Sequence, residues 1–241
     1  MAHSEEEASD EQAVRYMELV ERRYYGEPMQ YITGHAHFYG LPFRVMPDVL
    51  IPRPETEHLI EKVLEIAGGV ESARIVDVGT GSGCIAIALA HQLPDAAITA
   101  IDVSGAALTI ARENAELNGV AHRIRFLEGD LLDPVAGEQF DVVVSNPPYV
   151  SLADRDSLAV EVRDHEPAVA LFAGDDGLDI YRRLIAAAFT ALAPGGFVAL
   201  EIGCGQSAPI GELLECSGFR GIEFVPDLQG ILRVACAQRH T

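Results

Sequence analysis

From Arg74 to the C-terminus, short apolar runs alternate with segments of helical periodicity. The runs RIVDVG, AAITAIDV, RIRFLEGD, FDVVVS and FVALEIG are mostly apolar on both sides of the expected strand. Strands buried on both faces are typical of parallel sheets, in which helices cover each side. The sequence therefore predicts an α/β fold with a mostly parallel sheet. A closing pair of strands around PDLQGILRVACAQ predicts an antiparallel strand at the end of that sheet.

Three segments precede this region. Val14, Met17 and Val20 recur at roughly helical spacing, which predicts a short amphipathic helix near residues 11–25 that packs on the main domain. The stretch YITGHAHFYGLPFRVMPDVLIPRPETE is broken by glycine and proline and predicts a β-hairpin. A further helix is expected from Glu57 to Gly68.

The formal charge of −20 restricts the possible partners. A chain this acidic repels phosphate backbones unless it carries a local basic patch, and its densest basic cluster is only Arg22-Arg23. Nucleic acid is therefore not expected as a partner, whereas a cationic ligand or a basic protein suits the charge. No run of ~20 apolar residues indicates a membrane span, and the N-terminus lacks the pattern of a secretory signal. We expect a cytoplasmic protein without a membrane partner.

Neither the cysteines nor the histidines show the spacing of a metal site, so no metal is expected.

A nucleoside site is expected instead. The segment VDVGTGSGC places Gly79, Gly81 and Gly83 where a strand turns into a helix, and glycine there lets a ligand approach the main chain. Asp102 ends the next strand about 20 residues further on, where a carboxylate accepts hydrogen bonds from ribose hydroxyls.

The spacing of the glycines distinguishes between nucleoside cofactors. A dinucleotide loop reads G-x-G-x-x-G, whereas this loop reads G-x-G-x-G after Asp77. The Asp77 carboxylate would repel a pyrophosphate and attract an ammonium group, which favours S-adenosylmethionine. Asp130 ends the third strand near the expected position of the adenine, and Leu131 is placed to pack on that ring.

The tetrapeptide Asn146-Pro147-Pro148-Tyr149 follows the fourth strand, so it emerges at the same carboxyl edge as the glycine loop. Proline holds the preceding residue extended and has no N–H to compete for an acceptor. The motif therefore presents the Asn146 amide and a backbone carbonyl, which can both accept hydrogen bonds from one planar NH₂ group. Tyr149 can lie against the plane of that substrate.

This arrangement suits methyl transfer to an amide or exocyclic amino nitrogen, whose delocalised lone pair makes it a poor nucleophile. Binding both N–H groups orients the nitrogen and favours its pyramidal form in the transition state. Alignment with an electrophilic methyl group at ~3 Å is then the main requirement, and no strong base is needed.

With both motifs, the chain resembles the class I S-adenosylmethionine-dependent methyltransferases that carry Asn-Pro-Pro-Tyr. Among these it is similar to the protein-glutamine N5-methyltransferases that act on peptide chain release factors. The resemblance extends from Glu27 to Gln238 and rests on GEPMQYITG, VLIPRPETE, DVGTGSG, SNPPYVS, VRDHEPAVALFAGDDGL and DLQGILRVA. It implies a Rossmann-like sheet of seven strands. It also implies methylation of the glutamine in the Gly-Gly-Gln loop of the release factor, with S-adenosyl-L-homocysteine as product.

The resemblance also implies roles for individual residues. Cofactor contacts would come from Gly79, Thr80, Gly81, Ser82, Gly83, Asp102, Leu131 and Asn146. The substrate glutamine would be held by Asn146, Pro147, Pro148 and Tyr149. The segment Arg53-Pro54-Glu55-Thr56 would border the methionine end of the cofactor. Arg53 and Glu55 are candidates for substrate binding, or they brace the hairpin. Glu166 would shape the pocket wall without contacting substrate.

This family normally has a longer helical N-terminal domain before the GEP sequence, which docks the release factor. We therefore expect a shortened helical segment over 1–30, a hairpin linker over 31–54 and a methyltransferase catalytic domain over 55–241. Docking would then depend on a shortened segment or on other surfaces.

Three other functions are compatible with parts of the pattern. A nucleic-acid methyltransferase acting on adenine N6 or guanine N2 would present the same NH₂ group to the same motif, but the charge of −20 argues against it. A dinucleotide-dependent dehydrogenase would need a different glycine spacing. A non-catalytic nucleoside-sensing module would leave Asn-Pro-Pro-Tyr without a purpose.

Overall fold

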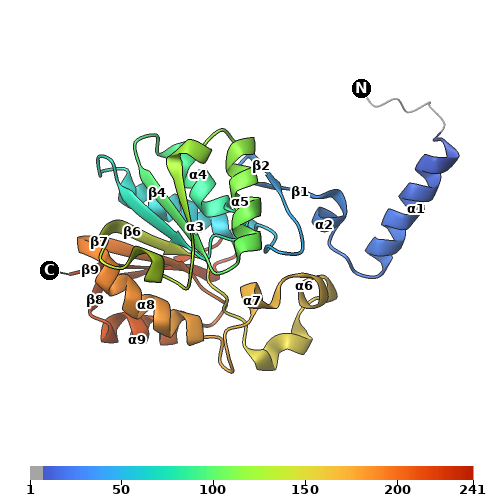
Figure 1. The fold of residues 1–241 in the computed structure, drawn as a ribbon. Helices are drawn as coiled ribbons and strands as arrows, with labels where there is room; N and C mark the ends of the chain where they lie inside the picture. Colours follow the sequence, from blue (N-terminus) through green and yellow to red (C-terminus); the bar gives the residue numbers. More distant parts are fainter. Residues whose placement is uncertain (1–7, 241) are drawn as a thin grey trace.

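The apolar runs that follow Arg74 form the strands of one seven-stranded sheet in the computed structural model, which describes residues 8–240 (Figure 1). In spatial order the strands are β5 (Ile124–Glu128), β4 (Ala97–Asp102), β3 (Arg74–Val78), β6 (Phe140–Ser145), β7 (Leu192–Glu201), β9 (Leu232–Arg239) and β8 (Phe219–Pro226). The pairs from β5 to β7 are parallel, and β9 is antiparallel to both of its neighbours. The predicted α/β fold is therefore confirmed.

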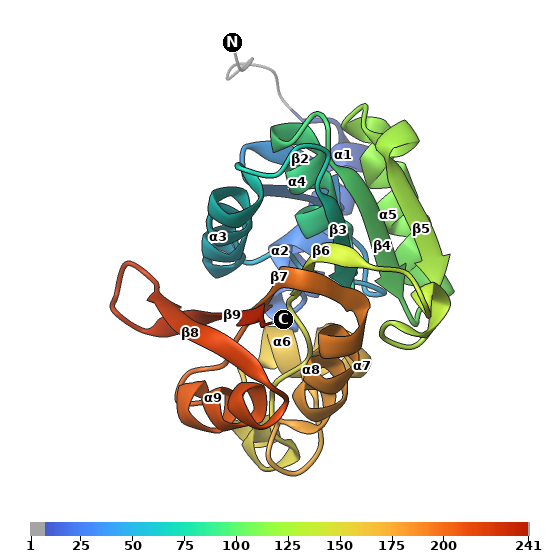
Figure 2. The ribbon, with the colours of Figure 1, turned by 90° about the vertical axis from the view of Figure 1, so that its left-hand side faces the viewer.

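The central strands are mostly apolar because both faces of the sheet are buried. Ile75 of β3 belongs to the core on one face, whereas its neighbour Val76 belongs to the core on the other face. Figure 2 shows the two helical layers. One layer consists of α3 (Glu57–Ala67), α4 (Cys84–Gln92) and α5 (Gly105–Leu117), and the other of α8 (Asp179–Ala191) and α9 (Ser207–Cys216).

Two details of the sheet differ from the sequence-based expectation. The segment DIYRRLIAAAFTALAPGG predicts a helix ended by Gly195-Gly196, but the helix ends at Ala191 and Leu192 already pairs with Phe140 of β6. Pro194 explains this end, because proline cannot continue a helix and disfavours helical geometry in the residue before it. The antiparallel strand β9 lies one position inside the edge, where it pairs with both β7 and β8.

The segment between β6 and α8 was not assigned to elements from sequence. It forms a 3₁₀-helix η4 (Leu152–Ser157) and the short helices α6 (Val160–His165) and α7 (Ala168–Leu171). Two more 3₁₀ turns, η2 (Ala121–Arg123) and η3 (Asp133–Val135), flank β5.

The N-terminal helix α1 (Asp10–Tyr24) projects away from the sheet (Figure 1). The expectation that it packs on the main domain is wrong, because none of its residues is buried. Its apolar side chains Val14 and Met17 are more than 60% exposed. An ion pair of 2.7 Å between Arg23 and Glu161 links its end to α6. The spacing of apolar residues predicted the helix but not what covers it.

The predicted hairpin is confirmed as β1 (His35–Phe38) and β2 (Leu41–Arg44), preceded by the short helix α2 (Met29–Thr33). Asn114 of α5 attaches this hairpin to the main domain. Its fully buried side chain accepts from the Arg44 N–H at 2.7 Å and donates to the carbonyls of Arg44 at 3.0 Å and Ser82 at 2.9 Å. One side chain thus joins the hairpin to the turn that precedes α4.

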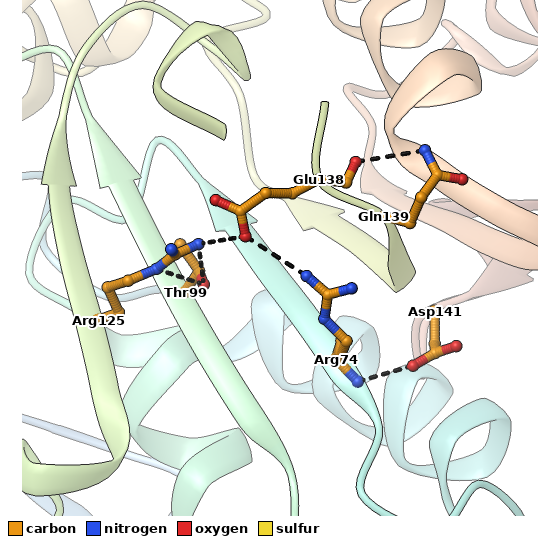
Figure 3. A network of polar contacts seen from close by, with 6 residues as sticks. All are labelled: Arg74, Thr99, Arg125, Glu138, Gln139 and Asp141. Atoms are coloured by element: carbon orange, nitrogen blue, oxygen red, sulfur yellow. Dashed lines mark hydrogen bonds and ion pairs between the residues drawn. The ribbon is translucent and has the colours of Figure 1, made fainter. Parts of the chain in front are cut away.

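A polar network lies near the amino ends of β3, β4 and β5, at the edge opposite to the one used by parallel-sheet ligand sites (Figure 3). Glu138 accepts from Arg125 at 2.8 Å and from Arg74 at 3.4 Å, and Arg125 also bonds Thr99. Asp141 accepts from the Arg74 backbone N–H at 2.8 Å. These arginines lie far apart in the sequence, so their clustering is a product of the fold, and the acids neutralise part of their charge.

No helix within residues 8–240 has the length and apolar character to cross a membrane.

Replacing Asn114 by alanine should reduce the free energy of unfolding by roughly 3 kcal/mol, because one part-buried N–H and two carbonyls lose their hydrogen bonds to this buried side chain. Chemical denaturation measures this change. The control is Glu113→Ala, one residue away, where an exposed ion pair with Arg44 should contribute less than about 1 kcal/mol. Equal losses in the two variants would contradict the linking role of Asn114.

Candidate active site

A pocket with a cavity volume of about 160 Å³ opens at the carboxyl ends of β3, β4, β5 and β6. Its walls contain most of the residues that the sequence singled out. These are Arg53, Gly79, Thr80, Gly81, Ser82, Asp102, Asp130, Leu131, Asn146, Pro147 and Pro148. Asp77, Gly83, Glu55 and Tyr149 lie outside this lining. The parallel strands therefore bring the two predicted motifs to one cavity.

The glycine loop has a backbone that other residues rarely adopt. Gly79 and Gly81 have φ angles of +72° and +55°, and a Cβ atom on either would meet nothing within 4 Å. Gly83 has φ +82° and also lies against α5, where an added Cβ would come within 3.2 Å of Ala111 Cβ. The first two glycines thus leave open space above the loop, and the third allows close helix packing.

Asp77 supports this loop from below. Its side chain is fully buried, and Oδ2 accepts hydrogen bonds from Thr80 Oγ1 at 2.6 Å and Ala86 N at 3.2 Å. Burial raises the pKa of Asp77 to about 7, although the bonds from Thr80 and Ala86 oppose this shift. The other oxygen, Oδ1, has no hydrogen-bond partner among residues 8–240. A buried acceptor without a partner is costly, so a cationic ligand near this loop would relieve it.

Asp102 ends β4 with both carboxylate oxygens held by the backbone. Oδ2 accepts from Gly81 N at 2.8 Å and Oδ1 from Ser104 N at 2.9 Å. Burial raises the pKa of Asp102, and these backbone hydrogen bonds counteract the effect. A carboxylate has about four lone-pair sites, so Asp102 keeps acceptor capacity toward the pocket.

Asp130 and Leu131 lie beside each other in the pocket wall but differ in character. Asp130 is exposed and its carboxylate pairs with Arg183 of α8. Leu131 has a φ of +49°, an uncommon conformation for a residue with a side chain. Strained backbone conformations concentrate at functional sites, so this φ angle supports a functional role for the pocket.

Asn146 and the two prolines form the pocket wall next to the glycine loop. The Asn146 Nδ2 group donates to Thr56 Oγ1 at 3.2 Å, which leaves its Oδ1 as an acceptor. The carbonyl of Pro147 accepts no hydrogen bond from any donor within residues 8–240. Ser145, just before the motif, donates to the Val78 carbonyl at 2.6 Å and so ties the end of β6 to the end of β3.

Tyr149 is not part of this pocket lining and packs against the core cluster that includes residues of α8 and α9. Its carbonyl accepts from Gln206 Nε2 at 3.0 Å, and Gln206 in turn accepts from Gly203 N. Burial raises the pKa of Tyr149 to about 12, so the ring stays neutral. The tyrosine therefore anchors the end of the motif.

Arg53 binds Glu166, a contact that the sequence did not predict. Its guanidinium donates to both carboxylate oxygens of Glu166, at 2.6 and 2.7 Å. Glu166 is buried, and burial raises its pKa while Arg53 lowers it. The pair joins the segment before α3 to Pro167 and α7, which also border the pocket.

Glu201 was missed by the sequence reasoning, and the hydrogen bonds of Thr56 were not predicted, although its segment was expected to border the cofactor. Thr56 bonds Asn146, and it donates to Glu201 Oε2 at 2.6 Å. Glu201 ends β7 and is buried, and burial raises its pKa to about 7. An acid at the end of the apolar run FVALE was the available signal for Glu201. Thr56 lines the pocket, as expected for the segment Arg53-Pro54-Glu55-Thr56, but nothing in the sequence indicated its hydrogen-bond partners.

Comparison with known proteins places this geometry among the methyltransferases. The family model described as Methyltransferase small domain matches residues 55–163, and the PrmC N-terminal domain matches residues 1–34. Among solved structures, the ribosomal protein L11 methylase from Lactobacillus delbrueckii subsp. bulgaricus is 26% identical, with a TM-score of 0.59 over 82% of this chain and 86% of that one. A methyltransferase from Pyrococcus furiosus, 19% identical, shares the fold with a TM-score of 0.64 over 97% of this chain and 100% of that one.

Curated relatives are considerably more similar in sequence. A release factor glutamine methyltransferase from Koribacter versatilis is 47% identical over 97% of this chain and 82% of its own length. One of the same name from Moorella thermoacetica is 46% identical over 99% of this chain and 84% of its own length.

The seven-stranded sheet, the glycine loop after β3 and the Asn-Pro-Pro-Tyr motif after β6 define an enzyme of the class I methyltransferases. Within this class, the chain belongs to the release factor glutamine methyltransferase family. The resemblance inferred from the sequence motifs is therefore confirmed.

The buried acid Asp77 should make the stability of the protein depend on pH. Its pKa is about 7 in the folded state and near 4 when unfolded, so the folded state binds the extra proton between these values. As pH rises from 5 to 8, the wild type should lose on the order of 2–4 kcal/mol of unfolding free energy relative to Asp77→Asn. Denaturation at several pH values measures this difference. A difference that stays constant with pH would contradict the raised pKa.

Proposed function

We propose that this enzyme transfers a methyl group from S-adenosylmethionine to the side-chain amide nitrogen of the glutamine in the Gly-Gly-Gln loop of peptide chain release factors. The observation that carries this proposal is the pair of free acceptors at the pocket, Asn146 Oδ1 and the Pro147 carbonyl. They adjoin the glycine loop and Asp102 in one cavity. The names of the relatives support the identity of the substrate.

Several residues of the pocket fit S-adenosylmethionine. The open space above Gly79 and Gly81 would accept its methionine moiety, and the unpartnered oxygen of buried Asp77 suits a nearby ammonium group. Asp102 would accept hydrogen bonds from the ribose hydroxyls, and Leu131 would pack on the adenine. When bound, this cofactor supplies an electrophilic methyl group next to a sulfonium.

The substrate amide would be held by its two N–H groups. One would donate to Asn146 Oδ1 and the other to the Pro147 carbonyl, so the nitrogen has a defined orientation. Both acceptors are rigid, because Asn146 is hydrogen-bonded to Thr56 and two prolines follow it. Binding geometry rather than a strong base would therefore supply the rate acceleration.

We also propose the division of the chain into a helical segment over 1–30, a hairpin linker over 31–54 and a catalytic domain over 55–241. The hairpin and the pocket support it, because β1 and β2 form a sheet of their own and the pocket is lined mainly from beyond residue 48. Arg53 would act as a brace between the hairpin and α7 through Glu166, which also limits its reach toward substrate.

A methyl-transfer assay tests the proposal. The protein is incubated with labelled S-adenosylmethionine and, in separate reactions, with a release factor, the same factor with its loop glutamine replaced by alanine, or total RNA and DNA. Label in the intact factor alone supports the proposal. Label in RNA or DNA, or in the alanine variant at the same level, would refute it and favour a nucleic-acid or another protein target.

Asn146→Ala should lower kcat by on the order of 10²-fold, because the substrate nitrogen loses one of its two orienting acceptors. Cofactor affinity, measured by calorimetry, should fall much less. Asn118→Ala, at the residue that caps the C-terminal end of α5, serves as the control, since Asn118 lies outside the pocket lining. A rate near that of wild type in Asn146→Ala would remove the basis of the proposed role.

Asp102→Ala should weaken binding of S-adenosylmethionine by roughly 10- to 100-fold, the range for losing hydrogen bonds to a charged acceptor. Titration calorimetry measures the affinity. Asp95→Ala is a matched control, because Asp95 is an exposed aspartate that precedes the opposite end of the same strand, β4. Unchanged affinity in Asp102→Ala would exclude the proposed ribose contact.

A further inference from the structure

A buried chain of hydrogen bonds stands behind Asn146. Asn146 follows β6, Thr56 belongs to the 3₁₀ turn η1 (Pro54–Thr56), and Glu201 ends β7. Asn146 Nδ2 donates to Thr56 Oγ1 at 3.2 Å, and Thr56 Oγ1 donates to Glu201 Oε2 at 2.6 Å. Thr56 and Glu201 are each only 2% exposed. Three segments far apart in the sequence thus converge on one side-chain amide.

The chemistry of the three groups determines which group donates and which accepts at each hydrogen bond. An ionised carboxylate can only accept, so the single proton of the Thr56 hydroxyl is used for Glu201. The Thr56 oxygen can then only accept from Asn146, and the group that faces it must be the NH₂ end of the carboxamide. The carbonyl end of Asn146 consequently remains for the substrate.

We propose that Thr56 and Glu201 are positioning residues that set the orientation of the Asn146 carboxamide, so that its oxygen and not its NH₂ group receives the substrate nitrogen. This inference rests on the proposed function, since it assigns these residues to the same methyl-transfer site. Neither residue touches the reacting atoms. They act through Asn146.

The Asn146 carboxamide needs such orienting hydrogen bonds because its two ends have nearly the same shape. The oxygen and nitrogen ends of asparagine have nearly the same shape, so packing alone does not distinguish the two orientations. With the wrong end forward, Asn146 would present a donor to a substrate NH₂ group, which is also a donor. The Thr56 hydroxyl oxygen fixes the orientation of Asn146, because it accepts only from the NH₂ end of the carboxamide. The Glu201 carboxylate in turn fixes the hydroxyl, because it accepts the hydroxyl proton.

The orientation of Asn146 depends on the negative charge of Glu201. If Glu201 binds a proton, it can donate to Thr56, whose hydroxyl then donates to the Asn146 oxygen and reverses the chain. The pKa of Glu201 is raised to about 7 by burial, so this reversal falls in an accessible pH range. The other charged or titratable groups around Glu201 are Arg53, Glu55, Cys84, Tyr149, Tyr181 and Arg233. The two arginines lower this pKa and Glu55 raises it.

The first test compares Thr56→Val, which keeps the shape but lacks the hydroxyl, with Thr56→Ser, which keeps the hydroxyl. At pH 8, where Glu201 is ionised, Thr56→Val should lower kcat for release-factor methylation by roughly 10- to 100-fold, the scale for losing orientation of a reacting group. Thr56→Ser should restore most of the rate. The KM for S-adenosylmethionine and its calorimetric affinity should change little in both variants.

The second readout is the pH dependence of these rates. The ratio of wild-type to Thr56→Val kcat should shrink as the pH falls from 8 to 6, because the wild type loses the correct orientation and the variant has none to lose. Effects of Asp77, which titrates in the same range, occur in both proteins and cancel in the ratio. A ratio that does not change with pH would overturn the role of Glu201.

A third measurement needs no activity, and it tests the hydrogen-bond chain in the wild-type protein. In ¹⁵N-labelled wild type, the Asn146 side-chain amide, identified by its absence in Asn146→Ala, should exchange with water several-fold more slowly than exposed Gln229. Exchange as fast as that of Gln229 would overturn the inference.

The outcomes separate this inference from the proposed function. Wild type that methylates the release factor, together with a Thr56→Val variant of equal rate, sinks the positioning role and leaves the proposed function intact. A Thr56→Ser variant as slow as Thr56→Val also sinks it, because the hydroxyl would then not be the cause. Wild type that does not label the factor refutes the proposed function, and the exchange measurement still tests the hydrogen-bond chain.

Discussion

Burial of the central strands on both faces is the constraint on which the site depends. Because Ile75 and Val76 enter opposite cores, β3 cannot slip by one residue without placing apolar side chains on the wrong faces. Parallel pairing with β4 and β6 then puts Gly79, Asp102 and Asn146 at one edge. The pocket is therefore positioned by the hydrophobic pattern of strands that contribute little to its chemistry.

Asp102 lines this pocket, and two further carboxylates, Asp77 and Glu201, lie behind its lining. Asp77 is fully buried and holds the glycine loop, Asp102 is held by two backbone amides, and Glu201 is held by Thr56. Burial raises the pKa of all three, since a charge is less stable away from water. Perturbed acids of this kind concentrate at functional sites, and here they adjoin the residues that the motifs indicated.

The segment before α3 links the outer parts of the molecule to this edge. Arg53 holds Glu166 beside α7, and Thr56 holds both Asn146 and Glu201. The RPETE sequence therefore connects several parts of the molecule through the side chains of Arg53 and Thr56. Its side chains connect the hairpin side, the Asn-Pro-Pro-Tyr motif and the end of β7, which accounts for the dense arrangement of proline, charge and hydroxyl groups in so few residues.

The sequence by itself determined the α/β sheet, the glycine loop, the place of Asn-Pro-Pro-Tyr and the family, because these depend on local pattern and on strand order. Only the tertiary structure decided which polar groups meet. The pairs Arg53 with Glu166 and Thr56 with Glu201 join residues more than 100 positions apart, and no local periodicity encodes such contacts. The exposure of α1 was likewise decided by tertiary packing, because helical propensity forms a helix but does not supply the surface that covers its apolar side chains.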